Sequence, residues 1–199
     1  MSEIRCFFVV ESGRTTQSLR RYRSVEGEAK CEASGWGYHN AECRIEDAPT
    51  RKSEDGCHLT SPSPREFRGD PRWPARCACG YEFVADDHWQ VFTDSIYRNE
   101  ATGEEWPMRS LPPGAMYDAW WYRGEDGKGI GSEKVGPDGL CLCVCLPPGG
   151  GLDYWHVDGP AKGGGGWTRT GTVPNVTARP SILTPNYHGF LTDGVLRDC

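Results

Sequence analysis

The sequence contains ten cysteines, and the spacing of three of them is compatible with metal chemistry. They occupy alternate positions in the segment GLCLCVCLPPGGG, residues 139–151: Cys141, Cys143 and Cys145. Side chains of an extended strand alternate between its two faces, so the three sulfurs share one face and the intervening Leu142, Val144 and Leu146 share the other. The leucine face is an ordinary core face. The sulfur face is either a thiol-lined core face or one side of a metal site.

A second cysteine pair lies in a turn-forming motif, Cys77-Ala78-Cys79-Gly80. Two thiols on a tight turn followed by glycine resemble one half of a zinc knuckle, although the usual knuckle has two residues between its cysteines and this one has a single residue. Tetrahedral zinc requires two further ligands. The preferred candidates are Cys43 and Cys57, and the alternatives are Cys31, His39 and His58. His39 and Cys43 are four positions apart, which would place them on one face of a helical turn.

The alternating strand offers a second metal site. The β carbons of Cys143 and Cys145 are about 6–7 Å apart in a strand, and zinc can bridge them with bonds of about 2.3 Å to each sulfur. We expect the C-terminal hairpin to cover the sulfur face and to bring His188 and Cys199 to this pair, with the prolines and glycines after the strand making room for them. Ligation would also tie down Cys199, which as a chain end otherwise frays. The alternative is three packed thiols and an unligated Cys199.

Composition and charge exclude several classes of protein. The 199 residues include 26 glycines and 15 prolines, which favours turns and short strands over long helices. The formal net charge of −6 argues against nucleic acid and anionic membranes as partners. The apolar run at residues 6–10 ends at Glu11, too early for a signal peptide, so a cytosolic location is expected. Because thiols stay reduced there, metal binding is favoured over disulfides, and Cys6 is expected to be a small buried apolar residue.

The chain is predicted to be mainly β, with short helices as a minor α+β component, in three regions. Residues 1–25 are expected to form an N-terminal hairpin, residues 26–84 a loop-rich zinc-binding insert, and residues 85–199 a β-rich domain. The polar stretch 26–76 has too few apolar residues to build a core, so a metal ion would have to order it. A short helix is predicted at the start of HWQVFTDSIY, residues 88–97. Hairpin turns are predicted at Thr102-Gly103 and Asp193-Gly194.

One set of residues suggests an enzyme instead. Carboxylate and imidazole groups occur together in GGLDYWHVDG, and with a later histidine they could hold a catalytic metal with an open position for water: Asp153, His156, Asp158 and His188. In a strand, however, His156 and Asp153 face opposite sides. We therefore favour a structural role for His156, and keep a metal-dependent hydrolase using His156, Asp158 and His188 as the alternative.

Several C-terminal segments resemble a known but uncharacterised family. They are LCVCLPPGG, HVDG, Gly166-Trp167, VTARPSI and YHGFLTDGVL, and they are similar to a domain of tailed phages and bacterial operons that is often labelled ammonia monooxygenase. The segments WPARCACGYEF, DHWQVF, YRNEATGEEW and PPGAMYDAWW resemble hypothetical proteins of phages that infect actinobacteria. The resemblance covers most of residues 70–199. It implies a phage-type protein that binds metal through the strand at 141–145 and His188.

The sequence thus predicts a non-catalytic, zinc-binding structural or interaction protein of phage type. One or two structural zinc ions are expected on eight residues: Cys43, Cys57, Cys77, Cys79, Cys143, Cys145, His188 and Cys199. The expected partner is a virion or host protein, with the protein located in the host cytoplasm or in the virion.

Overall fold

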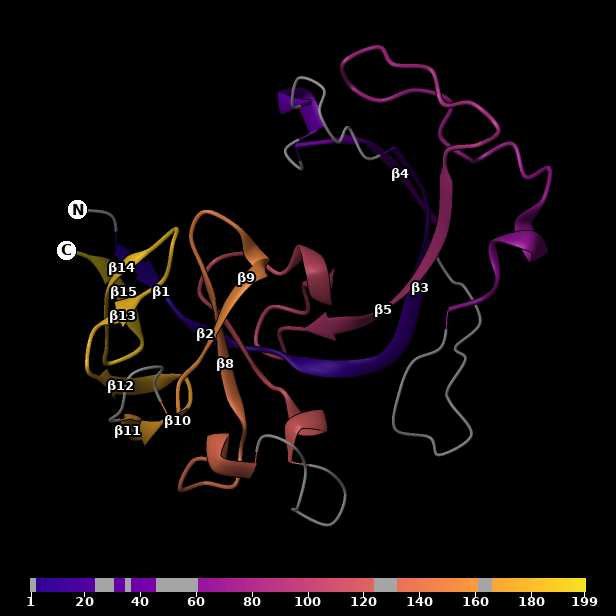
Figure 1. Ribbon diagram of the computed structural model, residues 1–199. Coiled ribbons are helices and arrows are strands. Elements are labelled where there is room, and N and C mark those ends of the chain that lie inside the picture. The colour runs from indigo at the N-terminus through magenta and orange to yellow at the C-terminus, as the bar shows by residue number, and fades with distance from the viewer. Residues whose placement is uncertain (1–2, 24–30, 35–36, 46–60, 124–131, 161–165) are drawn as a thin grey trace. The chain divides into compact units, whose positions relative to one another are not determined.

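The computed structural model describes residues 3–23, 31–34, 37–45, 61–123, 132–160 and 166–199 (Figure 1). The predicted fold class is confirmed, because the described chain is mainly β and its helices are short 3-10 turns. The chain divides into two compact units. Unit 1 comprises Met1–Ser12 and Ile96–Cys199, and unit 2 comprises Gly13–Ser95.

Unit 2 is built on three strands that lie in the order β4-β3-β5 (Figure 1). They are β3 (Val10–Arg23), β4 (His39–Ile45) and β5 (His88–Arg98). The antiparallel register of β3 and β4 places Leu19 opposite Cys43. Two 3-10 helices, η1 (Glu32–Ser34) and η2 (Pro64–Phe67), lie in the connecting segments.

The buried apolar clusters of unit 2 are small. One joins Leu19, Trp73 and Val91, with Ile45 and Phe67 packed against it. The other joins Cys31, Cys77 and Phe83, with Ala41 and Tyr81 at its border. Much of the remaining burial in β3 is polar: Thr15, Thr16, Gln17, Ser18, Arg20 and Arg21. Among its described residues, unit 2 therefore combines little apolar core with many buried polar groups.

Two expectations for these segments are wrong. Residues 10–23 form the single strand β3 and do not fold back as a hairpin. The preceding short strands pair elsewhere: β1 (Glu3–Arg5) pairs with β15 (Val195–Asp198), and β2 (Phe7–Phe8) pairs with β7 (Ala115–Asp118). Residues 88–97 also form a strand from their first residue. Pairing with β3 decides this, because β-branched and aromatic side chains fit a half-buried sheet better than a helix.

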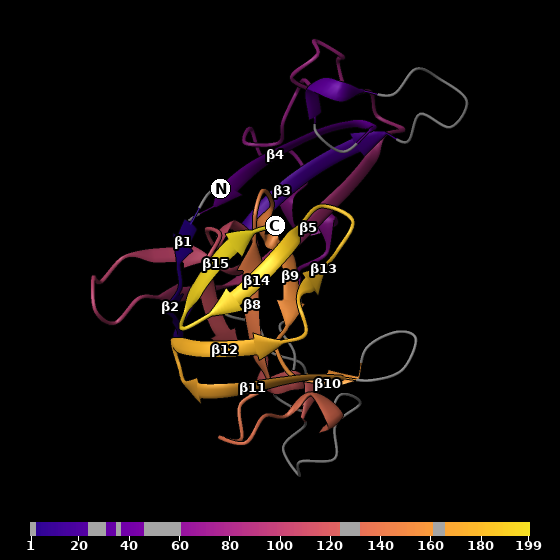
Figure 2. The same ribbon diagram turned by 90° about the vertical axis from the view of Figure 1, so that its left-hand side faces the viewer.

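The described part of unit 1 contains three sheets, whose strands are drawn in Figures 1 and 2. The first has the order β2-β7-β8-β9, with β7 (Ala115–Asp118), β8 (Leu142–Leu146) and β9 (Gly150–His156). The second has the order β1-β15-β14-β13, with β13 (Ile182–Leu183), β14 (His188–Thr192) and β15 (Val195–Asp198). The third comprises β10 (Gly159–Pro160), β11 (Gly166–Thr172) and β12 (Asn175–Arg179).

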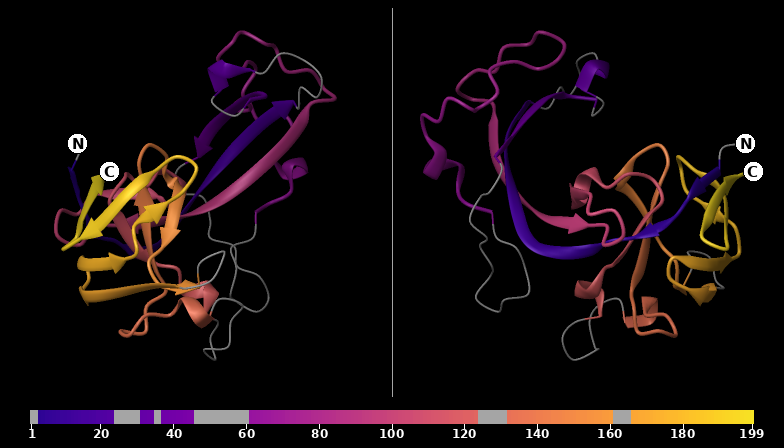
Figure 3. Two further views of the ribbon diagram at one scale, coloured as in Figure 1. Left: turned by 60° about the vertical axis from the view of Figure 1, so that its left-hand side comes forward. Right: turned by 180° about the vertical axis from the view of Figure 1, so that it is seen from behind.

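The first and last strands of the chain are neighbours, and both views of Figure 3 place their ends side by side. Strand β6 (Glu105–Pro107) pairs with the end of β5. The described residues of this unit also form three 3-10 helices: η3 (Met108–Ser110), η4 (Trp120–Tyr122) and η5 (Ser132–Lys134). Both predicted hairpins are confirmed. Tyr97 pairs with Trp106 across one of them, and Thr192 pairs with Val195 across the other.

The alternating strand β8 is buried on both faces. Its leucine face, with Leu142, Val144 and Leu146, packs in the cluster that also holds Leu191 and Leu196 of the C-terminal hairpin. Its sulfur face packs in a separate cluster with Tyr97, Leu111 and Tyr117. The two faces are as predicted, but the expectation that the C-terminal hairpin covers the sulfur face is wrong.

The glycines that follow β8 have a packing role that differs from the one expected. A β carbon on Gly150 would meet the carbonyl oxygen of Leu111, and one on Gly151 would meet that of Met108. The amide of Gly151 donates a hydrogen bond to the Leu111 carbonyl at 2.7 Å. Glycine is therefore needed because the backbone around η3 lies directly against β9, not because ligands require room.

No helix among the described residues has the length and apolar character needed to cross a membrane.

Candidate metal centre

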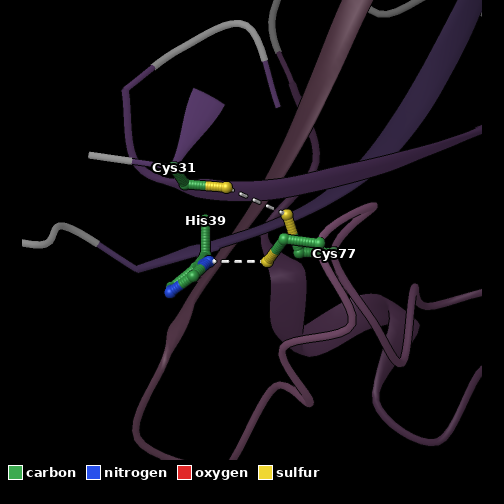
Figure 4. Close-up of side chains that lie close together, drawn as sticks. Cys31, His39 and Cys77 are labelled. Atoms are coloured by element: carbon green, nitrogen blue, oxygen red, sulfur yellow. Dashed lines mark hydrogen bonds between the residues drawn. The ribbon is translucent and has the colours of Figure 1, made fainter. Parts of the chain in front are cut away.

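Four side chains of unit 2 that could bind a metal ion converge from three separate segments, and Figure 4 labels three of them, Cys31, His39 and Cys77. Cys31 directly precedes η1, His39 is the first residue of β4, and Cys77 and Cys79 lie in the segment between η2 and β5. Their ligand atoms all lie within 4.8 Å of one another. The described residues contain no other such group of three or more cysteine, histidine or acidic side chains.

A tight turn presents the two sulfurs of the Cys77–Gly80 motif. The amide of Gly80 donates to the carbonyl of Cys77 at 2.9 Å, and the amide of Cys77 donates to the carbonyl of Tyr81, also at 2.9 Å. Gly80 has φ +92°, a conformation that residues with a β carbon rarely adopt. The amides of Cys79 and Tyr81 point at the sulfurs of Cys77 and Cys79 respectively. This is the arrangement expected of a knuckle that holds thiolates.

Two distances within the cluster are close to those around a tetrahedral metal. The sulfurs of Cys31 and Cys77 are 3.8 Å apart (Figure 4). Nδ1 of His39 is 3.2 Å from the sulfur of Cys79. Two sulfurs bound at about 2.3 Å to one tetrahedral zinc are about 3.8 Å apart, and a sulfur and a nitrogen are about 3.6 Å apart. The side chains therefore need only small adjustments to share one ion.

The ring of Tyr81 holds the imidazole of His39 in place. The two rings are stacked, with centroids 4.1 Å apart and an angle of 3° between their planes. The Tyr81 hydroxyl lies 3.2 Å from a carboxylate oxygen of Asp87 and accepts a hydrogen bond from Arg23 at 3.1 Å. Asp87 is buried and also accepts from the amide of Val84 at 2.8 Å. A ligand orientation supported in this way is typical of metal sites.

The two cysteines of the knuckle have unequal electrostatic environments. Burial acts to raise the pKa of Cys77, but hydrogen bonds from the amides of Cys79 and Asn40, and from the His39 and Cys31 side chains, outweigh it and lower this pKa to about 6. For Cys79 the Tyr81 amide acts to lower the pKa, whereas desolvation and the neighbouring thiols of Cys31 and Cys77 prevail and raise it. Several thiolates in one small volume repel one another, and a bound cation would relieve that repulsion.

The cluster has a buried side and an exposed side. Cys31 and Cys77 are buried beside Phe83, His39 is half-buried, and Cys79 is exposed to solvent. Solvent therefore reaches the centre at the sulfur of Cys79.

Sequence reasoning found half of this group directly. The sequence predicts Cys77 and Cys79 as ligands and offers Cys31 and His39 as alternatives, and the structure brings all four together. Cys43 is not part of the group, because residues 39–45 form strand β4, in which residues four apart are separated by about 13 Å instead of stacking as in a helical turn. Cys57 and His58 lie outside the described residues. The stacking partner Tyr81 was missed, although an aromatic residue directly after the Cys-x-Cys-Gly motif was a usable signal.

The residues of the second predicted metal site do not form a comparable group in the described chain. Cys143 and Cys145 are buried on β8, whereas His188 and Cys199 are exposed on β14 and after β15. The sulfur of Cys143 contacts Nδ1 of His156 at 3.2 Å. Metal binding by these four residues stays a prediction.

The residues of the hydrolase alternative have separate structural partners. Asp158 is buried and accepts a hydrogen bond from Arg169 at 2.5 Å, and Asp153 accepts from Asn186 at 2.9 Å. Burial and the nearby charge of Lys134 lower the pKa of His156 to about 4. His156, Asp158 and His188 do not belong to a common ligand group in the described part of the chain.

Comparisons of the chain with protein-family models, with curated proteins and with solved structures gave no match.

Proposed function

We propose that Cys31, His39, Cys77 and Cys79 bind one structural zinc ion that stabilises unit 2, and that the protein acts through binding and not through catalysis. The observation that carries this proposal is the convergence of four protein ligands within 4.8 Å of one another. Four protein ligands complete a tetrahedral shell, whereas a catalytic zinc keeps a position open for water. Three thiolates and one imidazole are soft and borderline ligands, which favour zinc over magnesium or calcium.

The limited core of unit 2 supports a stabilising role for the ion. Among the residues of unit 2 that the structure describes, each of the two buried clusters contains three buried apolar residues. A structural zinc contributes folding free energy on the order of 10 kcal/mol in small modules. Here it would connect residue 31, the start of β4 and the segment before β5.

The proposed biological role is that of a phage-type structural or interaction protein with a virion or host protein as its partner, acting in the host cytoplasm or in the virion. The resemblance of residues 70–199 to phage domains supports this role. A closed metal centre leaves no coordination position for a substrate, which also favours binding over catalysis.

The test begins with the metal content of the purified full-length protein. We expect one zinc per chain in the wild type and a loss of that zinc when Cys77 and Cys79 are both replaced by serine. The double variant should be cut by protease within unit 2, while the fragment beginning near residue 96 persists. Cys43→Ser is the matched control, because this thiol lies in the same unit and outside the cluster. Wild-type protein without metal, or a double variant with unchanged metal content, would contradict the proposal.

A further inference from the structure

The solvent exposure of the cysteines indicates which thiol of the cluster an oxidant in solution reaches first. Among the described cysteines, Cys79 and Cys199 are exposed and Cys43 is half-buried, whereas Cys6, Cys31, Cys77, Cys141, Cys143 and Cys145 are buried. Cys79 alone among these accessible thiols belongs to a group that contains further sulfurs within 4.8 Å. When an oxidant in solution reacts with Cys79, the thiols of Cys31 and Cys77 are close enough to react with the oxidised sulfur.

The two buried sulfurs of the cluster are placed to form a disulfide. Cys31 and Cys77 have sulfurs 3.8 Å apart, so each must move by about 1 Å to reach a disulfide bond length of about 2.05 Å. A bond between Cys77 and Cys79 would close a very small ring across a single intervening residue, which is strained. The favoured final pair is therefore Cys31 with Cys77.

We propose that Cys79 is an oxidation site through which a hydroperoxide opens the metal centre, releases the zinc and leaves a disulfide between Cys31 and Cys77. This inference rests on the proposed function, because it requires zinc to be bound in the reduced protein.

The chemistry balances in three steps. The Cys79 thiolate attacks the peroxide, an S–O bond forms, the O–O bond breaks, and the departing hydroxide takes up a proton to give water. The Cys31 thiolate then attacks the sulfenic acid of Cys79, forming an S–S bond and displacing hydroxide, which is again protonated to water. Finally the Cys77 thiolate attacks the sulfur of Cys31 and displaces Cys79 as a thiolate. Two thiolates lose two electrons in total, and one hydrogen peroxide and two protons become two waters.

The oxidised product keeps the link between Cys31 and Cys77 and loses the links that the zinc ion makes to His39 and Cys79. The disulfide still joins residue 31 to residue 77, so the two segments remain linked. His39 and Cys79 are left without enough partners to hold zinc, because two of the four ligands have been consumed. Oxidation should therefore free the start of β4 and the knuckle without unfolding the rest of the chain.

The direct test uses zinc-loaded, full-length protein treated with hydrogen peroxide. Zinc release is followed with a chromogenic chelator, and disulfides are mapped by mass spectrometry after non-reducing digestion. We expect release of one zinc per chain, a peptide pair linked through Cys31 and Cys77, and Cys79 recovered as a thiol. Dithiothreitol followed by Zn²⁺ should restore the metal content. Zinc that stays bound after oxidation, or a disulfide in another pair, would overturn the inference.

A substitution separates the role of Cys79 as a ligand from its role as the reactive thiol. Cys79→His supplies another zinc ligand and removes the exposed sulfur, so this variant should bind zinc and release it at least roughly tenfold more slowly in peroxide. Cys43→Ser should release zinc at the wild-type rate, because this thiol lies outside the cluster. Equal rates of zinc release in Cys79→His and wild type would overturn the assignment of Cys79 as the oxidation site and would leave the proposed zinc binding intact. Absence of zinc before peroxide is added would instead overturn the proposed function on which the site rests.

Discussion

The imidazole of His39 lies flat against the phenol ring of Tyr81, with the two planes only 3° apart. The residues are distant in sequence, and the stack aims Nδ1 of His39 at the sulfur of Cys79, 3.2 Å away. Tyr81 is in turn held by Asp87 and Arg23 through its hydroxyl. The orientation of one proposed metal ligand therefore depends on a side chain outside the ligand group.

Removing the Tyr81 ring should weaken metal binding. Loss of a group that orients a ligand typically lowers metal affinity about 10- to 100-fold, so Tyr81→Ala should raise the Kd for zinc by that factor. Tyr81→Phe keeps the stack and loses the hydrogen bonds, so it should have the smaller effect. Competition titration with a chelator of known affinity measures both. Equal affinities in wild type and Tyr81→Ala would exclude a positioning role for this ring.

Substitution of the turn glycine of the knuckle should weaken zinc binding because of backbone strain and not because of a steric clash. Gly80 has φ +92° and open space where a β carbon would lie, so Gly80→Ala should cost about 1–2 kcal/mol of backbone strain, seen as weaker zinc binding. In Gly194→Ala the added carbon would also lie 2.5 Å from the Pro174 carbonyl oxygen, and the loss of stability should be larger. Chelator competition and thermal unfolding measure these effects. A Gly80→Ala variant with wild-type zinc affinity would contradict the assigned turn.

Breaking the buried ion network of unit 1 should destabilise the protein. Arg169 pairs with Asp138 and Asp158, and only 1% of its side chain is exposed. Arg169→Met leaves the buried Asp158 without its partner and should lower the free energy of unfolding by about 3–5 kcal/mol. Adding Asp158→Asn to this variant removes the uncompensated charge and should restore part of the stability. Chemical denaturation measures the series, and a double variant no more stable than Arg169→Met would refute the explanation.

The neutral His156 should make unit 1 sensitive to acid. Its pKa is lowered from 6.5 to about 4 by burial and by Lys134, so between these values the unfolded chain binds a proton that the folded chain does not. The free energy of unfolding is therefore unaffected by protonation of this residue above pH 6.5. It decreases as the pH falls toward 4, by an amount on the order of 2 kcal/mol. In His156→Gln the corresponding decrease should be absent. Unfolding curves of both proteins from pH 7 to pH 4.5 measure the difference, and parallel pH profiles would refute it.

Local patterns in the sequence determined the β class, the two hairpin turns and the alternation of β8. Each depends on neighbours only a few positions apart: Asp193-Gly194 suits a tight turn, and leucine, cysteine and valine in alternation suit a strand buried on both sides. The Cys-x-Cys-Gly motif likewise identified one half of the candidate metal centre, because its geometry is set within four residues.

Only the tertiary structure decided which groups complete that centre. Cys31 meets Cys77 across 46 positions, and His39 meets Cys79 across 40, so both contacts depend on how β4 and the segment before β5 pack and not on local spacing. The same holds for β8, since alternation assigns its residues to two faces but does not say which face the C-terminal hairpin covers. Leu191 and Leu196 place the hairpin on the leucine face, because burying apolar area there is more favourable than covering a row of thiols.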